Sequence, residues 1–269
     1  MNRARQLRIL FLLLILFAVA ANTWLTRLRT TSWEHPLVVA IYPLNADGSA
    51  AATAHIAALE RDDFADIEDF FAEEASHYGL ALKQPFEIVL GPTLHQPPPL
   101  PAAEPSLLGN VWWSLRMRFW AWRVAREYGP PANIQLFVRY HDPASHPRLA
   151  HSLGLQKGLT GMVNAFAGRR AMGGNHLIIA HELLHTVGAS DKYDPASDLP
   201  RYPVGYAEPA REPLYPQEYA EIMAGRIPLG PRRAVQARSL SRALVGPWTA
   251  LEIRWIDELP PAYGSLAVE

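Results

Sequence analysis

The chain has 269 residues, of which 49% are hydrophobic and 19% are charged, and its formal net charge is −1. A charge this close to balance gives no basic surface for nucleic acid, and the length suits one globular unit with a single hydrophobic core. Because the chain has no cysteine, disulfides and thiolate metal ligands are excluded, so any bound metal must use His, Asp or Glu.

The first thirty residues have the pattern of an export signal. Three arginines precede an unbroken apolar run over 9–21, and Trp24 and two more arginines follow it. Residues 9–25 are just long enough to cross a bilayer, which predicts a membrane anchor; the small residues 18–20 also fit the cleavage site of a signal peptide. Either way, we expect 31–269 to form one domain outside the cytoplasm, membrane-anchored or secreted.

The residues after this segment alternate between strand and helix patterns. β-Branched apolar runs predict strands at 37–44 and 86–90. Apolar residues that recur every three to four positions predict one long helix over 53–78, which Gly79 ends and whose acidic side chains form a solvated face. Six prolines make 91–105 a loop.

A second predicted helix, 106–128, carries four tryptophans among arginines. Burial in the core explains the tryptophans, and a helix lying on a membrane surface is the alternative. Strands are predicted at 134–140 and 159–167, followed by a helix over 176–187 with Asn175 as its cap. This alternation predicts an α/β fold with a mixed sheet.

The chain after residue 188 differs in composition. A proline-rich irregular stretch precedes two helical patterns, at 232–244 and 248–258. We therefore expect a larger part over 33–188 and a smaller, helical C-terminal part over 189–269.

The stretch HELLHTVGASD, which begins at His181, has the spacing of a metal site. Residues four apart share one face of a helix, so His181 and His185 project together and can bind one ion. Imidazole is a good ligand for Zn²⁺, and Glu182 stands where a general base can reach a zinc-bound water. Gly188 can adopt the positive φ that turns the chain back, which lets Asp191 supply a third ligand.

This stretch resembles the metzincin metallopeptidases, whose motif is HExxHxxGxxH, with aspartate as the last ligand in a minority such as the snapalysins. Metzincins also place a methionine on a tight turn beneath the metal, and Met223 in AEIMAGR follows Asp191 by 32 residues. The resemblance covers about 177–227. It implies a mixed sheet with long helices and an active-site helix, and a sheet edge at 159–167 where an extended substrate adds as a strand. Gly225 stands where some metzincins have a tyrosine.

The resemblance implies a zinc metalloendopeptidase that cleaves peptide or protein substrates outside the cytoplasm. His181, His185 and Asp191 would hold Zn²⁺, and Glu182 would assist attack by the zinc-bound water. The implied partners are the substrate and, through the N-terminal segment, a membrane, but not nucleic acid. The alternative function is a zinc-stabilised, non-catalytic, membrane-anchored binding module.

Three questions about ligands stay open at this point. The binding-module alternative needs a fourth ligand, because structural zinc sites are usually closed by four protein groups, and the candidates are Tyr193 and Asp194. A later glutamate can replace the aspartate as third ligand, and the candidates are Glu208, Glu212, Glu218 and Glu221. Three more histidines fit no helical pair, which favours surface positions over a second site: His141, His146 and His151.

Overall fold

The computed structural model describes residues 13, 14, 17, 30–100, 106–149, 152–155, 159–264 and 266. Apart from three residues, the predicted anchor lies outside these ranges, as does His151. Among the residues described, no helix is both long enough and apolar enough to cross a membrane.

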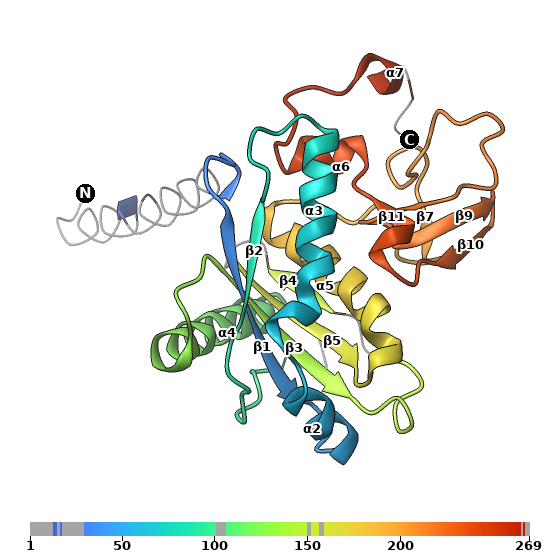
Figure 1. Ribbon diagram of the computed structural model, residues 1–269. Coiled ribbons are helices and arrows are strands. Elements are labelled where there is room, and N and C mark those ends of the chain that lie inside the picture. Colours follow the sequence, from blue (N-terminus) through green and yellow to red (C-terminus); the bar gives the residue numbers. More distant parts are fainter. Residues whose placement is uncertain are drawn as a thin grey trace.

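A five-stranded sheet organises the first part of the chain (Figure 1). Its strands stand in the order β2-β1-β3-β5-β4; the first four are parallel and β4 runs antiparallel to β5. The four predicted strands are confirmed to within one residue, and the short β4 was not predicted. The strands are β1 (Leu37–Asn45), β2 (Phe86–Leu90), β3 (Ile134–His141), β4 (Leu153–Leu155) and β5 (Thr160–Phe166).

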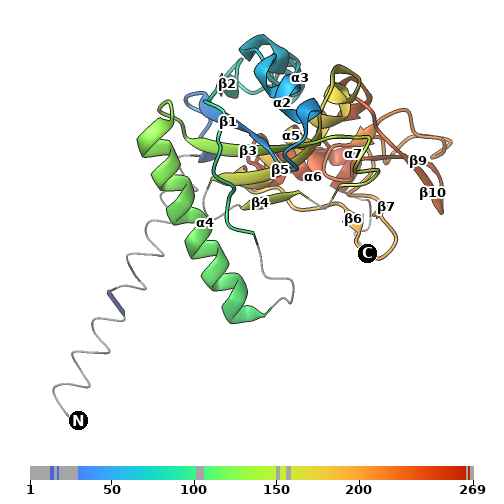
Figure 2. The same ribbon diagram turned by 90° about the horizontal axis from the view of Figure 1, so that it is seen from below.

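Helices cover both faces of this sheet, which confirms the α/β class. Figure 2 shows the sheet between α4 on one side and α2, α3 and α5 on the other. Alternate residues of β1 face the two sides of the sheet. Val39 and Ile41 pack in the core beneath α3 and α5, whereas Tyr42 belongs to a second apolar cluster that includes Trp120 of α4. The helices are α2 (Ala50–Ala57), α3 (Ala65–His77), α4 (Leu107–Tyr128) and α5 (Met172–Val187).

The prediction of one continuous helix over 53–78 is wrong. Helix α2 ends at Ala57, and a short 3₁₀ turn, η1 (Arg61–Phe64), precedes α3. The break has a local cause, because the backbone N–H of Glu60 donates to the Asp63 carboxylate at 2.9 Å in a capping box that starts a new helical segment. Gly79, with φ +72°, follows the end of α3, as predicted.

Two acidic side chains of α3 are buried, so the prediction of a fully solvated acidic face is wrong. Glu68 accepts hydrogen bonds from the N–H of Ile88 at 2.6 Å and from Arg61. Glu74 accepts one from the N–H of Val245 at 2.6 Å, and burial raises its pKa to about 7. These bonds attach α3 to β2 on one side and to the C-terminal part on the other.

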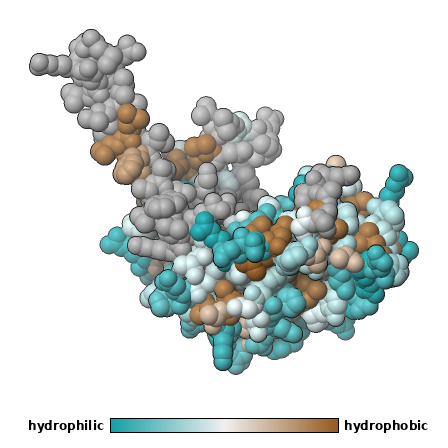
Figure 3. Space-filling model, turned by 90° about the horizontal axis from the view of Figure 1, so that it is seen from above, coloured by the Kyte–Doolittle hydropathy of each residue, from teal (hydrophilic) through white to brown (hydrophobic). Residues whose placement is uncertain are grey.

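Helix α4 has one buried and one exposed apolar face. Trp120 is buried as the core interpretation predicts, but Trp112 and Trp122 are 64% and 53% exposed. Among the side chains of this helix that the structure describes, the exposed large apolar ones are Val111, Trp112, Leu115, Phe119 and Trp122. Figure 3 shows the side of the molecule opposite to that in Figure 2, where hydrophobic areas lie among hydrophilic side chains.

The C-terminal part consists mainly of short strands and turns, so the two predicted helices are largely wrong. Residues 232–244 form a strand, a 3₁₀ turn and a second strand, because β10 pairs with β9 in an antiparallel hairpin. Of 248–258, only the beginning is helical. The elements are β6 (Tyr193–Asp194), β7 (Leu199–Pro200), β8 (Ala220–Glu221), β9 (Arg226–Gly230), β10 (Arg233–Gln236), η4 (Leu240–Arg242), β11 (Ala243–Leu244), α6 (Pro247–Glu252) and α7 (Pro261–Gly264).

Candidate metal centre

Helix α5, which carries the predicted ligands, starts four residues earlier than its sequence suggests. It begins at Met172, so Asn175 lies inside it and is not its cap. The Asn175 side chain instead bonds both backbone groups of Phe166, accepting from its N–H at 3.1 Å and donating to its carbonyl at 2.8 Å. A Cβ atom on Gly173 would come within 2.8 Å of the Arg238 carbonyl, so a side chain there would push the C-terminal part away. Helix α5 is thus held against both β5 and the C-terminal part.

The three predicted ligands converge on one point. The Nε2 atoms of His181 and His185 lie 3.1 Å apart, and Oδ1 of Asp191 lies 3.2 Å from each of them. Ligand atoms about 2.0 Å from a tetrahedral zinc ion are separated by about 3.3 Å, so this triangle has the dimensions of one face of a zinc site.

The hydrogen bonds of the two imidazoles show which atoms face this point. Nδ1 of His181 lies 3.0 Å from the Ile222 carbonyl, and Nδ1 of His185 lies 2.9 Å from the Ala189 carbonyl. A carbonyl can only accept, so each Nδ1 carries a proton and the Nε2 atom of each ring faces inward. Two ring nitrogens and the Asp191 carboxylate therefore face one another, as ligands do around a cation. These residues fit a metal ion.

The pKa shifts of His181 and Asp191 also favour a bound cation. Burial by itself lowers the pKa of His181, but the carboxylates of Asp191 and Glu182 outweigh burial and leave that pKa raised. Burial by itself raises the pKa of Asp191, but the two histidines outweigh it and hold that pKa well below its usual range. The electrostatic potential at the centre is thus negative and favours a bound positive charge.

Gly188 and the loop after it place Asp191. Gly188 has φ +118° and ψ 1° at the end of α5, which confirms the predicted turn. The guanidinium of Arg201 donates to the Asp191 carbonyl at 2.7 Å. The next residue, Lys192, is buried and forms an ion pair with Glu252 of α6. The ligand therefore sits on a fixed backbone.

The segment around Met223 supports the centre from the other side. Met223 is fully buried in a tight turn, where the N–H of Gly225 donates to the Glu221 carbonyl at 2.9 Å. The Ile222 carbonyl orients the first histidine ligand, and the Met223 carbonyl accepts from the N–H of Lys192 at 3.0 Å. One turn thus fixes both the helix ligand and the loop that carries the aspartate.

The alternative third ligands lie elsewhere. Glu208 and Glu218 both bind Arg211 at 3.0 Å, and Glu221 is buried, where it accepts a hydrogen bond from Thr249 at 2.6 Å. Among the described residues, the group of ligand atoms around the two helix histidines includes Asp191 and none of Glu208, Glu212, Glu218 or Glu221.

Within the described part of the chain, no further His, Asp or Glu joins this group as a fourth ligand. The carboxylate of Asp194 instead accepts from the N–H of Ala196 and from the Ser197 hydroxyl, both at 2.9 Å. Tyr193 is half-buried, and its pKa is raised by burial and then by the charges of Asp191 and Glu182, so it keeps its proton. Its place beside the centre depends on the β6–β7 pairing, for which the sequence carries no clear signal.

The predicted sheet edge at 159–167 is wrong. Strand β5 lies between β3 and β4, so it is an interior strand over Thr160–Met162. Further along, the N–H of Asn164 donates to the Ser152 hydroxyl at 3.0 Å and that of Phe166 to Asn175. These backbone donors are already occupied, and the edge of the sheet on this side is β4.

Comparison of the chain with protein-family models and with curated proteins finds no match for it. Its chemistry is therefore inferred from the centre itself: three converging ligand atoms with a buried carboxylate, Glu182, beside the first of them.

Proposed function

We propose that the protein is a zinc-dependent metallopeptidase of the metzincin type, with His181, His185 and Asp191 as the metal ligands. The observation that carries this proposal is the triangle of inward-facing ligand atoms at 3.1 to 3.2 Å. The mixed sheet and the helix that bears both histidines agree with the resemblance, whereas the strand-rich C-terminal part does not have the helices expected there.

Zinc, when bound, acts as a Lewis acid and lowers the pKa of water. Glu182 lies beside the first ligand, takes a proton from the attacking water and passes it to the leaving amine. Tyr193 keeps its proton because burial and neighbouring carboxylates raise its pKa, so it can donate a hydrogen bond to the carbonyl oxygen of a substrate. In this proposal an extended peptide lies along the β4 edge.

The number of ligands favours catalysis over a purely structural metal. Structural zinc is usually closed by four protein ligands, whereas catalytic zinc has three and an open position. The described residues supply three at this centre, which supports the enzyme over the non-catalytic binding module.

We also propose that the domain works at a membrane surface outside the cytoplasm. The support is the exposed apolar face of α4, where Trp112 and Phe119 are each 64% exposed. The exposed arginines Arg116 and Arg123 lie on the same helix, and basic side chains beside an apolar face suit an anionic lipid surface. This surface would act together with the apolar run over 9–21.

The experiment is hydrolysis of a peptide library by the full-length, zinc-loaded chain, with Glu182→Gln as the matched variant. Gln keeps the shape of the side chain but cannot take up a proton. We expect wild type to cleave peptides and the variant to lose roughly 10²- to 10⁴-fold in kcat while binding the same amount of zinc. A wild-type chain that holds zinc and cleaves nothing would support the binding module instead.

A further inference from the structure

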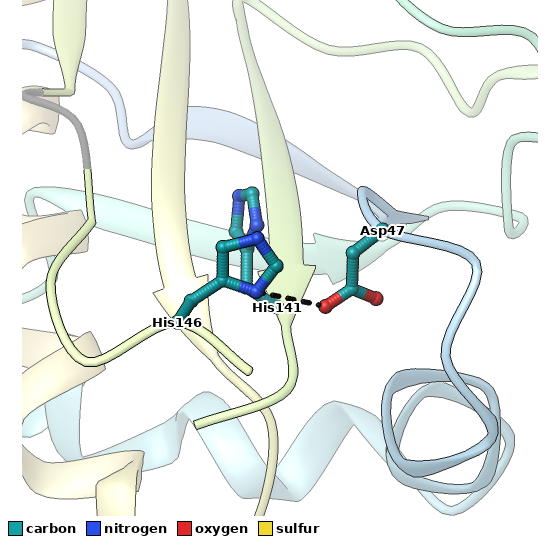
Figure 4. A group of neighbouring side chains, drawn as sticks. All are labelled: Asp47, His141 and His146. Atoms are coloured by element: carbon teal, nitrogen blue, oxygen red, sulfur yellow. Dashed lines mark ion pairs between the residues drawn. The ribbon is translucent and has the colours of Figure 1, made fainter. Parts of the chain in front are cut away.

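A second group of potential ligands lies at the ends of β1 and β3, on residues separate from the proposed catalytic centre (Figure 4). Asp47 follows β1, His141 is the last residue of β3, and His146 lies in the next loop. One ligand atom from each lies within 4.8 Å of the others, and Nδ1 of His146 is 3.3 Å from Oδ2 of Asp47. Both histidines are partly exposed, which agrees with the predicted surface positions, but the fold brings them together with Asp47, which their spacing does not indicate.

The protonation of His141 follows from its neighbours. Arg139, which can only donate, binds Oδ1 of Asn164 at 3.0 Å, so this oxygen is an acceptor. Nε2 of His141 lies 3.3 Å from the same oxygen and must therefore be the donor. A proton on Nε2 leaves Nδ1 as the ring atom that is available to a metal ion. That Nδ1 is buried and has no hydrogen-bond partner.

The other two members of the group are His146 and Asp47. Nδ1 of His146 is also buried and makes no hydrogen bond of acceptable geometry, although it lies near Asp47. The Asp47 carboxylate accepts from the N–H of Asp142 at 2.7 Å and from that of Ser49 at 2.9 Å. These two bonds fix the orientation of the Asp47 carboxylate.

We propose that Asp47, His141 and His146 form a second metal site, for a divalent transition metal ion such as Zn²⁺. The site would provide a partner for two buried imidazole nitrogens beside a fixed carboxylate. Two imidazoles and one carboxylate suit Zn²⁺, Co²⁺ or Ni²⁺ better than Ca²⁺ or Mg²⁺, which prefer oxygen ligands alone. Asn164 behind His141 and the two backbone N–H groups behind Asp47 orient the ligands, as outer-shell groups do in metal sites.

The ion would join the loop after β1 to the loop after β3 and so stabilise this end of the sheet. Because the three ligands meet only in the folded chain, the free energy of binding the ion adds to the free energy of folding. This role is independent of the proposed peptidase activity.

The test is the metal content of the full-length chain after loading with Zn²⁺ and dialysis, measured by plasma mass spectrometry. We expect two ions per chain in wild type, one in His146→Ala, one in Asp191→Ala and none in the double variant. His35→Ala, at an exposed histidine, is the matched control and should keep two. If Asp191→Ala keeps the wild-type metal content while His146→Ala loses one ion, the proposed catalytic centre is refuted and the second site is supported.

A second measurement covers the case in which His146→Ala does not fold. In the Asp191→Ala background, added Zn²⁺ should raise the Tm, since an ion that binds the folded state stabilises it, and Co²⁺ should give the visible absorption of a nitrogen-ligated site. If neither effect occurs in that background, or if His146→Ala keeps the wild-type metal content, the second site does not exist.

Discussion

Gly188→Ala tests whether the turn after α5 controls metal binding. Gly188 stands between the second and third ligands, with φ +118° and ψ 1°. Glycine adopts this conformation freely, whereas an added Cβ atom conflicts with the neighbouring backbone. Alanine must therefore either accept the strain or move the chain, and a movement shifts Asp191 away from the two histidines.

The magnitude follows from the backbone angles. A left-handed conformation costs an ordinary residue about 1–2 kcal/mol, and the angle at Gly188 lies beyond the most favourable part of that region. The metal-free chain can relax and the metal-bound chain cannot, because Asp191 must reach the ion. Since about 1.4 kcal/mol corresponds to a factor of ten, the dissociation constant for Zn²⁺ should rise roughly 5- to 30-fold.

Gly79→Ala is the matched control. Gly79 also follows the end of a helix with positive φ, at +72°, and an added Cβ atom there would meet nothing within 4 Å. It should lower the free energy of unfolding by about 1 kcal/mol and leave metal affinity unchanged. The assay is competition for Zn²⁺ against a chromogenic chelator, with urea denaturation of the metal-free chains. An unchanged dissociation constant in Gly188→Ala, or the same increase in Gly79→Ala, would refute the reasoning.

Three further predictions concern catalysis, pH and the membrane. Tyr193→Phe should lower kcat roughly 10²-fold at unchanged metal content, and a wild-type kcat would remove Tyr193 from the mechanism. Burial raises the Glu74 pKa from 4.5 to about 7, so stability should fall by about 3 kcal/mol as pH rises through that window. Urea denaturation at pH 4.5 and pH 8 should show this fall, which Glu74→Gln should remove; a fall of the same size in Glu74→Gln would contradict it. Because the chain lacks cysteine, a fluorophore on Phe119→Cys can be compared with one on exposed His77→Cys. In anionic vesicles, spin-labelled lipid should quench the first label, and equal quenching of both would exclude docking through α4.

The parts of the structure that the sequence predicts well are those set by neighbours along the chain. Four strands are marked by short apolar runs, and their ends lie within one residue of the prediction. The candidate centre is also local: His181 and His185 are one helical turn apart, and Asp191 follows after a glycine turn. Eleven residues therefore contain all three proposed ligands.

The predictions that are wrong depend on contacts between distant residues. The start of α5 is fixed by the bonds of Asn175 to Phe166, which hold two glycines of the first turn in helical form. Residues 232–244 have a helical pattern in isolation, but they pair with β9 and β8 as strands. The second group of ligands could not be found from spacing, because Asp47 follows β1 and His141 ends β3, and only the parallel pairing of these strands brings the two residues together.

The third proposed ligand is an aspartate, which explains why several contacts of the C-terminal part serve to position the backbone at Asp191. A carboxylate oxygen reaches less far from its backbone than an imidazole nitrogen, so the chain at Asp191 must approach the ion closely. Positive φ at Gly188 begins this approach, and the bonds of Arg201 to the Asp191 carbonyl and of Lys192 to Glu252 then hold it. The turn and both contacts use the backbone or a nearby residue, which leaves the carboxylate itself available to the metal.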